Sequence, residues 1–262
     1  PGSTRPGGGG APACVAWTDE DGARHEVEAS HVLAACAPAV LERLLGREPE
    51  PVEGAQLKVN MVLERLPRLR SDVDPAAAFA GTFHINETAS QIETAYREAA
   101  AGRVPSLPPA EIYCHTLSDP SILGPGPREA GWHTLTMFGL HMPARLFRAD
   151  PEGARGAALE AALDSLDSVL AEPVRDCLVT SPLGEPCVEA RTPVDIEAEL
   201  EMPGGNIFHR PLQWPWAEDE DERWTWGVRT EHPRVLLAGA GARRGGGVSA
   251  LAGHAAAMEL LG

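Results

Sequence analysis

The sequence predicts a mixed fold, an α/β unit combined with an α+β domain, and three observations predict it. Two short, continuous apolar runs, residues 31–36 and 234–239, stand far apart in the 262-residue chain and are typical of buried strands. Between them, residues 56–66 and 132–142 show the apolar and β-branched pattern of strands. A helix with a leucine stripe begins at residue 150. Hydrophobic residues make up 43% of the chain, which is enough for a real core.

The first unit should be a hairpin, a buried strand and a helix. Asp21-Gly22 is a hairpin turn signal between residues 14–18 (CVAWT) and 24–29 (RHEVEA). After the apolar run 31–36, Pro38 stands where a helix begins and Gly46 where that helix ends. The polar, proline-containing segment 47–54 is then a candidate domain boundary.

The next elements predict a sheet with helices over it. In residues 56–66 (QLKVNMVLERL), every second side chain is apolar, and residues 81–86 (GTFHIN) form a second predicted strand. Asn86 is expected to cap a helix that carries Ile92, Tyr96 and Ala99 and stops at Gly102. Further strands are predicted at residues 110–117 and 132–142.

The second half begins with the clearest helix. Asp150-Pro151 opens it, Leu159, Leu163, Leu166 and Leu170 form one stripe, and Pro173 lies just beyond its end. Residues 55–172 therefore read as a mixed sheet covered by helices. Residues 175–231 are rich in loops, with a short helix near residues 193–200, and the acidic run 217–222 is expected to be a solvated loop. A strand, a glycine-rich turn and a helix (residues 250–261) close the chain.

Charge and composition exclude several classes of function. The net charge of −16 repels phosphate backbones and anionic lipids, so nucleic-acid binding and peripheral membrane roles are disfavoured. No apolar run approaches the ~20 residues of a membrane helix, and no signal peptide is present. Five scattered cysteines without a CxxC pair indicate reduced thiols in a cytoplasmic protein, with no metal site. The Pro/Gly-rich start reads as a cut, so we expect a C-terminal piece of a longer protein.

The strongest chemical signal is the terminal unit of strand, glycines and helix. Gly239, Gly241 and Gly245–Gly247 allow close approach of a ligand to the backbone, and the following helix offers free N–H groups. The spacing matches only part of a dinucleotide fingerprint, because Arg244 stands at the third glycine position. The alternative is a buried strand that turns tightly into a packed helix.

Histidines are the other candidates. His84, His115 and His141 fall on three separate predicted strands and could line one cavity, and His209 lies in a near-strand context. Each could equally be a structural histidine. No GxSxG, HExxH or P-loop motif is present, so no catalytic side chain can be named.

Four stretches together resemble a known family: residues 31–46, 56–69, 203–216 and 235–262. They resemble the C-terminal half of the phytoene-desaturase-like flavoprotein oxidoreductases, in particular the group named pyridine nucleotide-disulphide oxidoreductase domain-containing protein 2. The blocks PGGNIFH and GAGARRGGGVS are specific as a pair. Ala250 stands where relatives often have Gly, which predicts ordinary backbone angles there.

The resemblance implies an FAD-dependent oxidoreductase that transfers hydride between flavin and an apolar or amphipathic substrate. The residues implied at the flavin are Gly241, Arg243, Gly245, Gly246, Gly247 and Val248. The implied domains are a leader (1–12), parts of the FAD-binding domain (13–46 and 231–262) and a substrate-binding domain with connecting loops (55–230). The histidines His84, His115, His141 and His209 are candidate substrate contacts.

The N-terminal Rossmann half of that family, with its GxGxxG motif, is absent from this sequence. The same gene or a partner chain would have to supply it. One alternative is a non-catalytic substrate-binding or assembly module that has lost the flavin, and another is an unrelated small-molecule-binding α+β domain. The family interpretation makes one sharp structural prediction: residues 234–239 and 31–36 lie in the same sheet.

Overall fold

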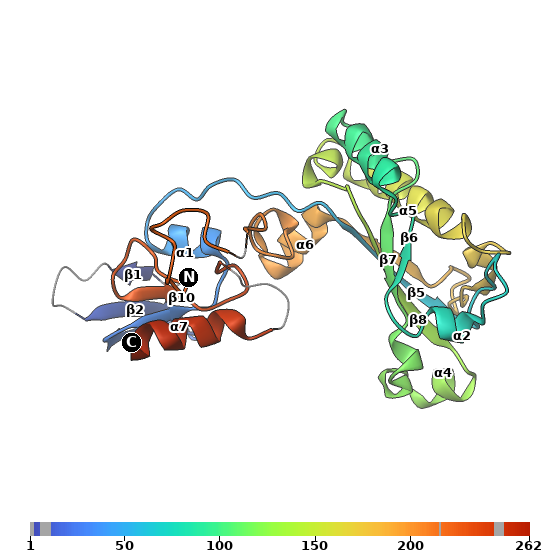
Figure 1. Cartoon of the computed structure of the whole chain (residues 1–262). Helices are drawn as coiled ribbons and strands as arrows, with labels where there is room; N and C mark the ends of the chain where they lie inside the picture. Colours follow the sequence, from blue (N-terminus) through green and yellow to red (C-terminus); the bar gives the residue numbers. More distant parts are fainter. Residues whose placement is uncertain (1–2, 6–11, 215, 244–248) are drawn as a thin grey trace. The chain divides into compact units, whose positions relative to one another are not determined.

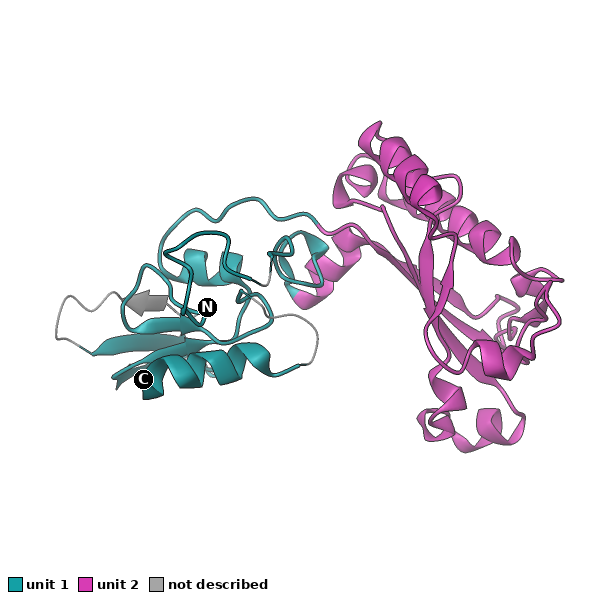
Figure 2. Cartoon of the chain, viewed as in Figure 1, with its two compact units in different colours: residues 1–53, 201–262 teal, residues 54–200 magenta. Residues whose placement is uncertain are grey.

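The computed structural model describes residues 3–5, 12–214, 216–243 and 249–262, and the chain forms two compact units (Figures 1 and 2). Unit 1 contains residues 1–53 and 201–262, and unit 2 is the continuous segment 54–200. Each unit has its own cluster of buried apolar side chains. The fold is mixed, with sheets and helices in both units.

An antiparallel meander begins unit 1. It consists of β1 (Ser3–Arg5), β2 (Ala13–Thr18) and β3 (Arg24–Ala29), in that order across the sheet. Gly22 lies in the turn between β2 and β3 and has φ of 81°. This turn requires a left-handed backbone, which glycine adopts without strain. The predicted hairpin is therefore confirmed, and β1 is an additional strand.

The two apolar runs form a parallel pair. Strand β4 (Val32–Ala34) lies beside β10 (Val235–Leu237), with Val32 opposite Val235. The Val32 amide donates to the Arg234 carbonyl at 2.8 Å, and the Ala238 amide donates to the Ala34 carbonyl at 2.8 Å. The prediction that these distant runs share one sheet is confirmed. Strand β10 is fully buried, as predicted, whereas β4 is not, because Leu33 is 47% exposed and only Ala34 is buried.

Two helices pack with this pair. In α1 (Pro38–Leu44), Pro38 is the first residue, and the chain leaves the helix at Gly46, with φ of 76°. Helix α7 (Leu251–Leu261) buries Ala252 and Ala256 in the same cluster as β10. Ala250 precedes α7 with φ of 59°, so the expectation of ordinary angles there is wrong: this alanine takes the left-handed conformation that glycine favours.

Unit 2 is built on a five-stranded sheet. Its strands, in spatial order, are β6 (Phe83–Ile85), β7 (Ala110–Tyr113), β8 (His133–Gly139), β5 (Leu57–Leu63) and β9 (Val188–Arg191). Every neighbouring pair is antiparallel, so the predicted mixed sheet is wrong in this respect. Alternation shows which face of a strand is buried, but it carries no information on strand direction.

Helix α5 (Pro151–Asp167) covers one face of this sheet (Figure 1). Asp150 caps it by accepting a hydrogen bond from the Gly153 amide at 3.1 Å, as the sequence predicts. Leu163 and Leu166 are buried against the sheet, as part of the predicted stripe. The remaining helices of unit 2 are α2 (Pro75–Ala78), α3 (Ala89–Ala100), α4 (Pro125–Glu129) and α6 (Pro193–Leu200).

Asn86 has a different role from the predicted cap of α3. Thr88 is the N-cap, because its hydroxyl accepts from the Gln91 amide, whereas Asn86 has φ of 55°. The Asn86 amide donates to the hydroxyl of the buried Ser165 at 2.9 Å, which ties the turn before α3 to α5. The two residues are both cap formers, and only the tertiary contact decides between them.

Residues 201–230, which the sequence groups with residues 55–200, pack in unit 1. Gly204 has φ of 61° and lies so close to Val52 that a Cβ would overlap the Val52 carbonyl oxygen. Asn206 is buried and donates to the Glu53 carbonyl at 3.2 Å. The GGN motif therefore fastens this segment to residues 52–53, at the point where the chain leaves unit 1. None of the described helices is long and apolar enough to cross a bilayer.

Candidate functional site

The glycines that follow β10 are explained in part by internal packing. A Cβ on Gly239 would overlap the backbone of Ala35, and a Cβ on Gly241 would overlap the ring of Pro38. The same added Cβ on Gly241 would also stand 3.3 Å from the Cβ of His209. Close approach is thus required here by the chain itself. Gly245, Gly246, Gly247 and Val248 lie outside the described residues, so their place beside a ligand stays a prediction.

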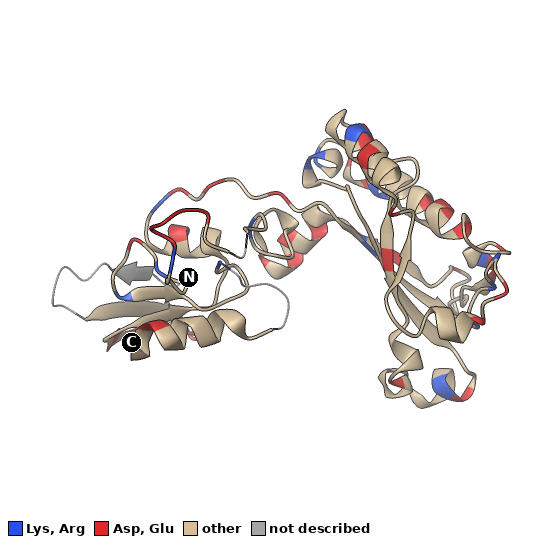
Figure 3. Cartoon of the chain, viewed as in Figure 1, with Lys and Arg blue, Asp and Glu red and all other residues tan. Residues whose placement is uncertain are grey.

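Arg243, in the same turn, is held by two acidic side chains and a carbonyl. Its side chain is only 12% exposed, and Nη2 donates to Glu218 and to the Trp216 carbonyl, each at 3.1 Å. Nη1 pairs with Glu222, whereas the buried Nε has no partner among the described residues. The five acidic residues 218–222 colour a continuous red stretch of this loop (Figure 3). Residues 218–221 are exposed, as expected of a solvated loop, whereas Glu222 is 27% exposed and ion-paired.

His209 and Arg210 lie beside the same turn. His209 has φ of 66°, and its Nδ1 is buried without a hydrogen-bond partner in the described part of the chain. Arg210 donates from Nη1 to the Gly241 carbonyl at 3.3 Å. Burial, with a smaller contribution from the charge of Arg243, lowers the pKa of Arg210 below its ordinary value. The Nδ1 of His209 is therefore an unsatisfied buried atom, and Arg210 is a partly buried cation without a carboxylate partner among the described residues.

A cavity of about 550 Å³ opens next to these two residues within unit 1. We call it the unit 1 cavity. It lies between α1, the connector 49–52, residues 209–211 and the segment 229–231. Its wall is mainly apolar, with Leu41, Pro49, Pro51, Val52, Pro211 and Leu237 among the lining residues. Its volume is in the range of small-molecule sites.

The histidines of unit 2 do not occupy three strands as predicted. His84 lies in β6, but His115 begins a 3₁₀ turn after β7, and His141 follows β8 with φ of 60°. Strand β7 ends early because the chain turns over at Cys114, and β8 ends at Gly139. His115 stacks on Tyr113 with ring centroids 6.0 Å apart, whereas His141 meets Tyr96 of α3 edge-to-face. Their role in substrate binding stays a prediction.

The histidine environments predict distinct titrations. The Glu87 carboxylate, 2.8 Å from Nδ1 of His84, raises the pKa of this imidazole, because it favours the charged form. Burial lowers the pKa of His141. An NMR titration should therefore find His84 charged at a higher pH than His141, and Glu87→Gln should bring His84 back toward the ordinary value. A Glu87→Gln variant with an unchanged His84 titration would contradict this assignment.

The face of the unit 2 sheet opposite α5 is open and half-buried. It carries alternate residues of β5, β7 and β8, among them Val62, Tyr113 and Thr134. A hollow of about 580 Å³, lined by Val62, Thr134 and His115 among others, lies on this face. The Thr134 hydroxyl is buried there without a hydrogen-bond partner among the described residues. We call this surface the open face.

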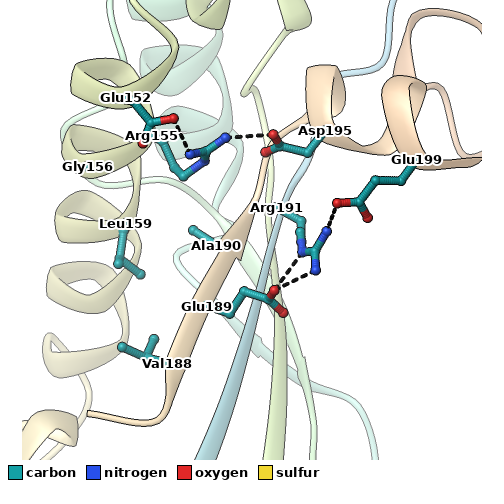
Figure 4. A pocket seen from close by; sticks show the side chains of 10 residues that line it. All are labelled: Glu152, Arg155, Gly156, Leu159, Val188, Glu189, Ala190, Arg191, Asp195 and Glu199. Carbon is teal, nitrogen blue, oxygen red and sulfur yellow. Dashed lines mark hydrogen bonds and ion pairs between the residues drawn. The ribbon is translucent and has the colours of Figure 1, made fainter. Parts of the chain in front are cut away.

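A second hollow of unit 2, of about 510 Å³, lies between α5, β9 and α6 (Figure 4). Arg155 joins Glu152 at 2.7 Å and Asp195 at 2.6 Å, and Arg191 joins Glu189 and Glu199. The Asp195 carboxylate also accepts a hydrogen bond from the Thr192 amide at 2.8 Å, at the N-terminal end of α6. Because the charged side chains around this hollow are paired with one another, we assign them to the scaffold.

Sequence reasoning missed two polar residues that line these hollows. Thr134, with its unsatisfied hydroxyl, and Arg210, a partly buried cation, carry no motif, and only burial in the folded chain makes them notable. Glu218 and Glu222 belong to an acidic run, in which the sequence does not show that these two pair with Arg243. Within the described residues, no group of three His, Cys, Asp or Glu side chains could hold a metal ion.

Comparisons with known proteins place this chain beside two sets of relatives. Over 250 residues it is 53% identical to uncharacterized proteins of Mycobacterium tuberculosis and Mycobacterium bovis, a match that covers 92% of this chain and 46% of each relative. It is 27% identical over 217 residues to the pyridine nucleotide-disulfide oxidoreductase domain-containing protein 2 of Mus musculus, covering 76% of this chain and 34% of that protein. The Rattus norvegicus counterpart is 28% identical over 220 residues. No family model matches the chain.

The chain thus spans about half the length of its mycobacterial relatives and about a third of the rodent proteins. It has distant homologues that are named as oxidoreductase domain proteins, and its resemblance to that group is supported to this extent.

Proposed function

We propose that the chain is the C-terminal part of an FAD-dependent oxidoreductase of the phytoene-desaturase-like type. The parallel pairing of β4 with β10, just before the glycine-rich turn and α7, carries the proposal. In open α/β sheets, ligands bind outside the carboxyl ends of parallel strands, and a helix that starts there offers free N–H groups. The distant oxidoreductase relatives support the same reading.

The residues present fit a flavin in one specific way. Arg243 has a buried Nε without a partner among the described residues, and a flavin carries several acceptor atoms. Arg243 and the turn 245–248 would hold it, with the start of α7 close in sequence. When bound, the flavin would supply the hydride chemistry, and the residues of this chain would bind, orient and exclude water.

Exposed apolar side chains indicate that unit 1 is completed by further polypeptide. Among described residues, thirteen large apolar side chains of unit 1 are more than a third exposed, against six in the larger unit 2. Those of unit 1 are Trp17, Val27, Leu33, Ile207, Phe208, Leu212, Trp214, Trp216, Trp224, Trp226, Leu251, Leu260 and Leu261. Apolar surface of this kind is typical of a face that another chain segment covers. We infer that a Rossmann half, from the same gene or a partner, packs there.

Unit 2 would then provide the surface that binds the substrate. Its open face combines apolar Val62 and Ile122 with the polar groups of Thr134 and His115 around one hollow. Such a mixture suits an amphipathic small molecule better than a purely apolar one. His84 lies in the edge strand β6. His141 contacts α3 and would have at most an indirect role.

The test is to purify the complete protein, with the polypeptide that precedes this chain in its gene, and to measure flavin absorbance. We expect stoichiometric FAD, released on denaturation. Arg243→Gln should lower the FAD content at least several-fold, because it removes a buried charge-assisted donor. Arg24→Gln makes the same charge change on the exposed β3 and should retain the wild-type content.

A complete, folded protein without any flavin would overturn the proposal. That result would favour the alternative of a substrate-binding or assembly module that has lost its cofactor. Normal FAD content in Arg243→Gln would leave the cofactor but contradict the role of Arg243.

A further inference from the structure

We propose that the unit 1 cavity binds a small organic monoanion with an apolar body, and that Arg210 and His209 hold its anionic group. The inference goes beyond the proposed function, and its test uses no flavin. It depends on two polar side chains that line the cavity, neighbours in the sequence, and on the composition of the remaining wall.

Arg210 is a cation without a counterion. The structure gives its guanidinium one hydrogen bond, to the Gly241 carbonyl at 3.3 Å, and no carboxylate of the described residues forms an ion pair with it. Residues 1–2, 6–11, 215 and 244–248, which the structure does not describe, include no Asp or Glu that could pair with Arg210. The nearby charge of Arg243 adds repulsion. A partly buried cation in this position is stabilised by an anion.

The other arginines that line the same cavity are neutralised. Arg47 pairs with Glu42 at 2.5 Å, and Arg229 pairs with Glu259 at 2.5 Å. Of the three arginines that line the cavity, Arg47 and Arg229 therefore have carboxylate partners, whereas Arg210 has none among the described residues. Arg210 keeps donors that a ligand can use, because a guanidinium has five N–H groups.

His209 adds a second available group beside Arg210. His209 lines the same cavity, and its Nδ1 is buried and makes no hydrogen bond to any described residue. The left-handed backbone of His209 fixes where its side chain starts. A buried polar atom without a partner costs free energy that a bound polar ligand would recover.

The rest of the wall selects the body of the ligand. Leu41, Val52 and Leu237 with three prolines form its apolar part, and a volume of about 550 Å³ exceeds the needs of an inorganic ion. Three glutamates also line the cavity: Glu42 and Glu231 both pair with Arg47, and Glu50 is exposed. One unpaired cation, Arg210, with His209 next to it in sequence matches a single carboxylate rather than a polyanion. A medium-chain or aromatic carboxylate has this chemistry.

The experiment is calorimetric titration of the complete protein with octanoate, 1-octanol, acetate and inorganic phosphate, and no flavin is added. We expect one saturable site for octanoate, with acetate and phosphate at least about tenfold weaker because they lack the apolar body. Arg210→Gln should weaken octanoate by about tenfold or more, since a charge-assisted pair is lost, and should leave octanol binding unchanged.

Arg43→Gln is the matched control: it removes one positive charge from the exposed side of α1, outside the cavity, and should bind octanoate like the wild type. Should Arg210→Gln fail to fold, as judged by circular dichroism, His209→Asn carries the test, because Asn tolerates a left-handed backbone. Absence of saturable octanoate binding, equal affinity for phosphate, or wild-type affinity in the folded variant would each overturn the proposal.

Discussion

Gly204→Ala is expected to destabilise unit 1 by about 3 kcal/mol or more. Two independent effects add at this residue. Its φ of 61° is strained for an L side chain, and a Cβ would overlap the Val52 carbonyl oxygen and crowd the Cα of Glu53. Relief would need a backbone shift in the connector, which Asn206 fastens at Glu53.

Hydrogen exchange measures this effect unit by unit. Amides of the β4–β10 pair, such as those of Val32 and Ala238, should lose protection in Gly204→Ala, whereas amides of β5 and β8 should keep theirs. Gly253→Ala is the control in the same unit: its Cβ would stand 3.9 Å from the nearest atom, and alanine favours the helix. Equal protection in Gly204→Ala and wild type would contradict the packing described for the GGN motif.

Glu172→Gln is expected to destabilise unit 2 by about 2–3 kcal/mol at neutral pH. Glu172 is 13% exposed, binds both terminal nitrogens of Arg65 at 2.7 and 3.0 Å, and accepts the Arg68 amide at 2.9 Å. These contacts, those to Arg65 first, lower the pKa of Glu172 to about 2. The carboxylate thereby joins the chain after β5 to the chain after α5.

The pH dependence has a definite sign. A lowered carboxyl pKa stabilises the fold above the ordinary value of 4.5, and this stabilisation is lost as the pH falls from there through about 2. The difference in unfolding free energy between wild type and Glu172→Gln should therefore be constant near neutrality and vanish toward pH 2. Denaturant titrations between these limits measure it.

Glu160→Gln serves as the comparison for Glu172→Gln. Glu160 pairs with Arg175 but is 64% exposed, so its removal should cost well under about 1 kcal/mol. A Glu172→Gln effect no larger than that of Glu160→Gln would contradict the assignment.

The sequence predicted those elements whose pattern reports burial directly. Strand β5 buries Leu57, Val59, Met61 and Leu63 on one face, as the alternation indicates, and Asp150-Pro151 opens α5. The pairing of β4 with β10 could also be predicted from the sequence, because two short apolar runs each need a partner strand to form a sheet. Strand β9 was missed, since Glu189 and Arg191 at a sheet edge read as loop.

The site was predictable only where a motif marks it. Glycines are visible in a sequence, yet the reason for Gly241 is the ring of Pro38, some two hundred residues away. The missing counterion of Arg210 and the unsatisfied Nδ1 of His209 depend on which carboxylates and carbonyls reach them after folding. Sequence patterns report which residues are buried, whereas hydrogen-bond satisfaction is a property of the assembled chain.

The parallel pair β4–β10 also fixes an order of events when the chain forms its structure. Strand β4 cannot complete its pairing until Val235–Leu237 is available, which closes a loop that contains all of unit 2. Unit 2 is contiguous, and its strands β7 and β8 are near neighbours along the chain, so its contacts cost far less loop-closure entropy. During synthesis from the N-terminus, unit 2 can therefore be folded while β4 still lacks its partner strand, although β1, β2 and β3 can already pair with one another. In that interval the apolar strand Val32–Ala34 is an unpaired edge, and its exposure is a kinetic cost of building one unit from two distant segments.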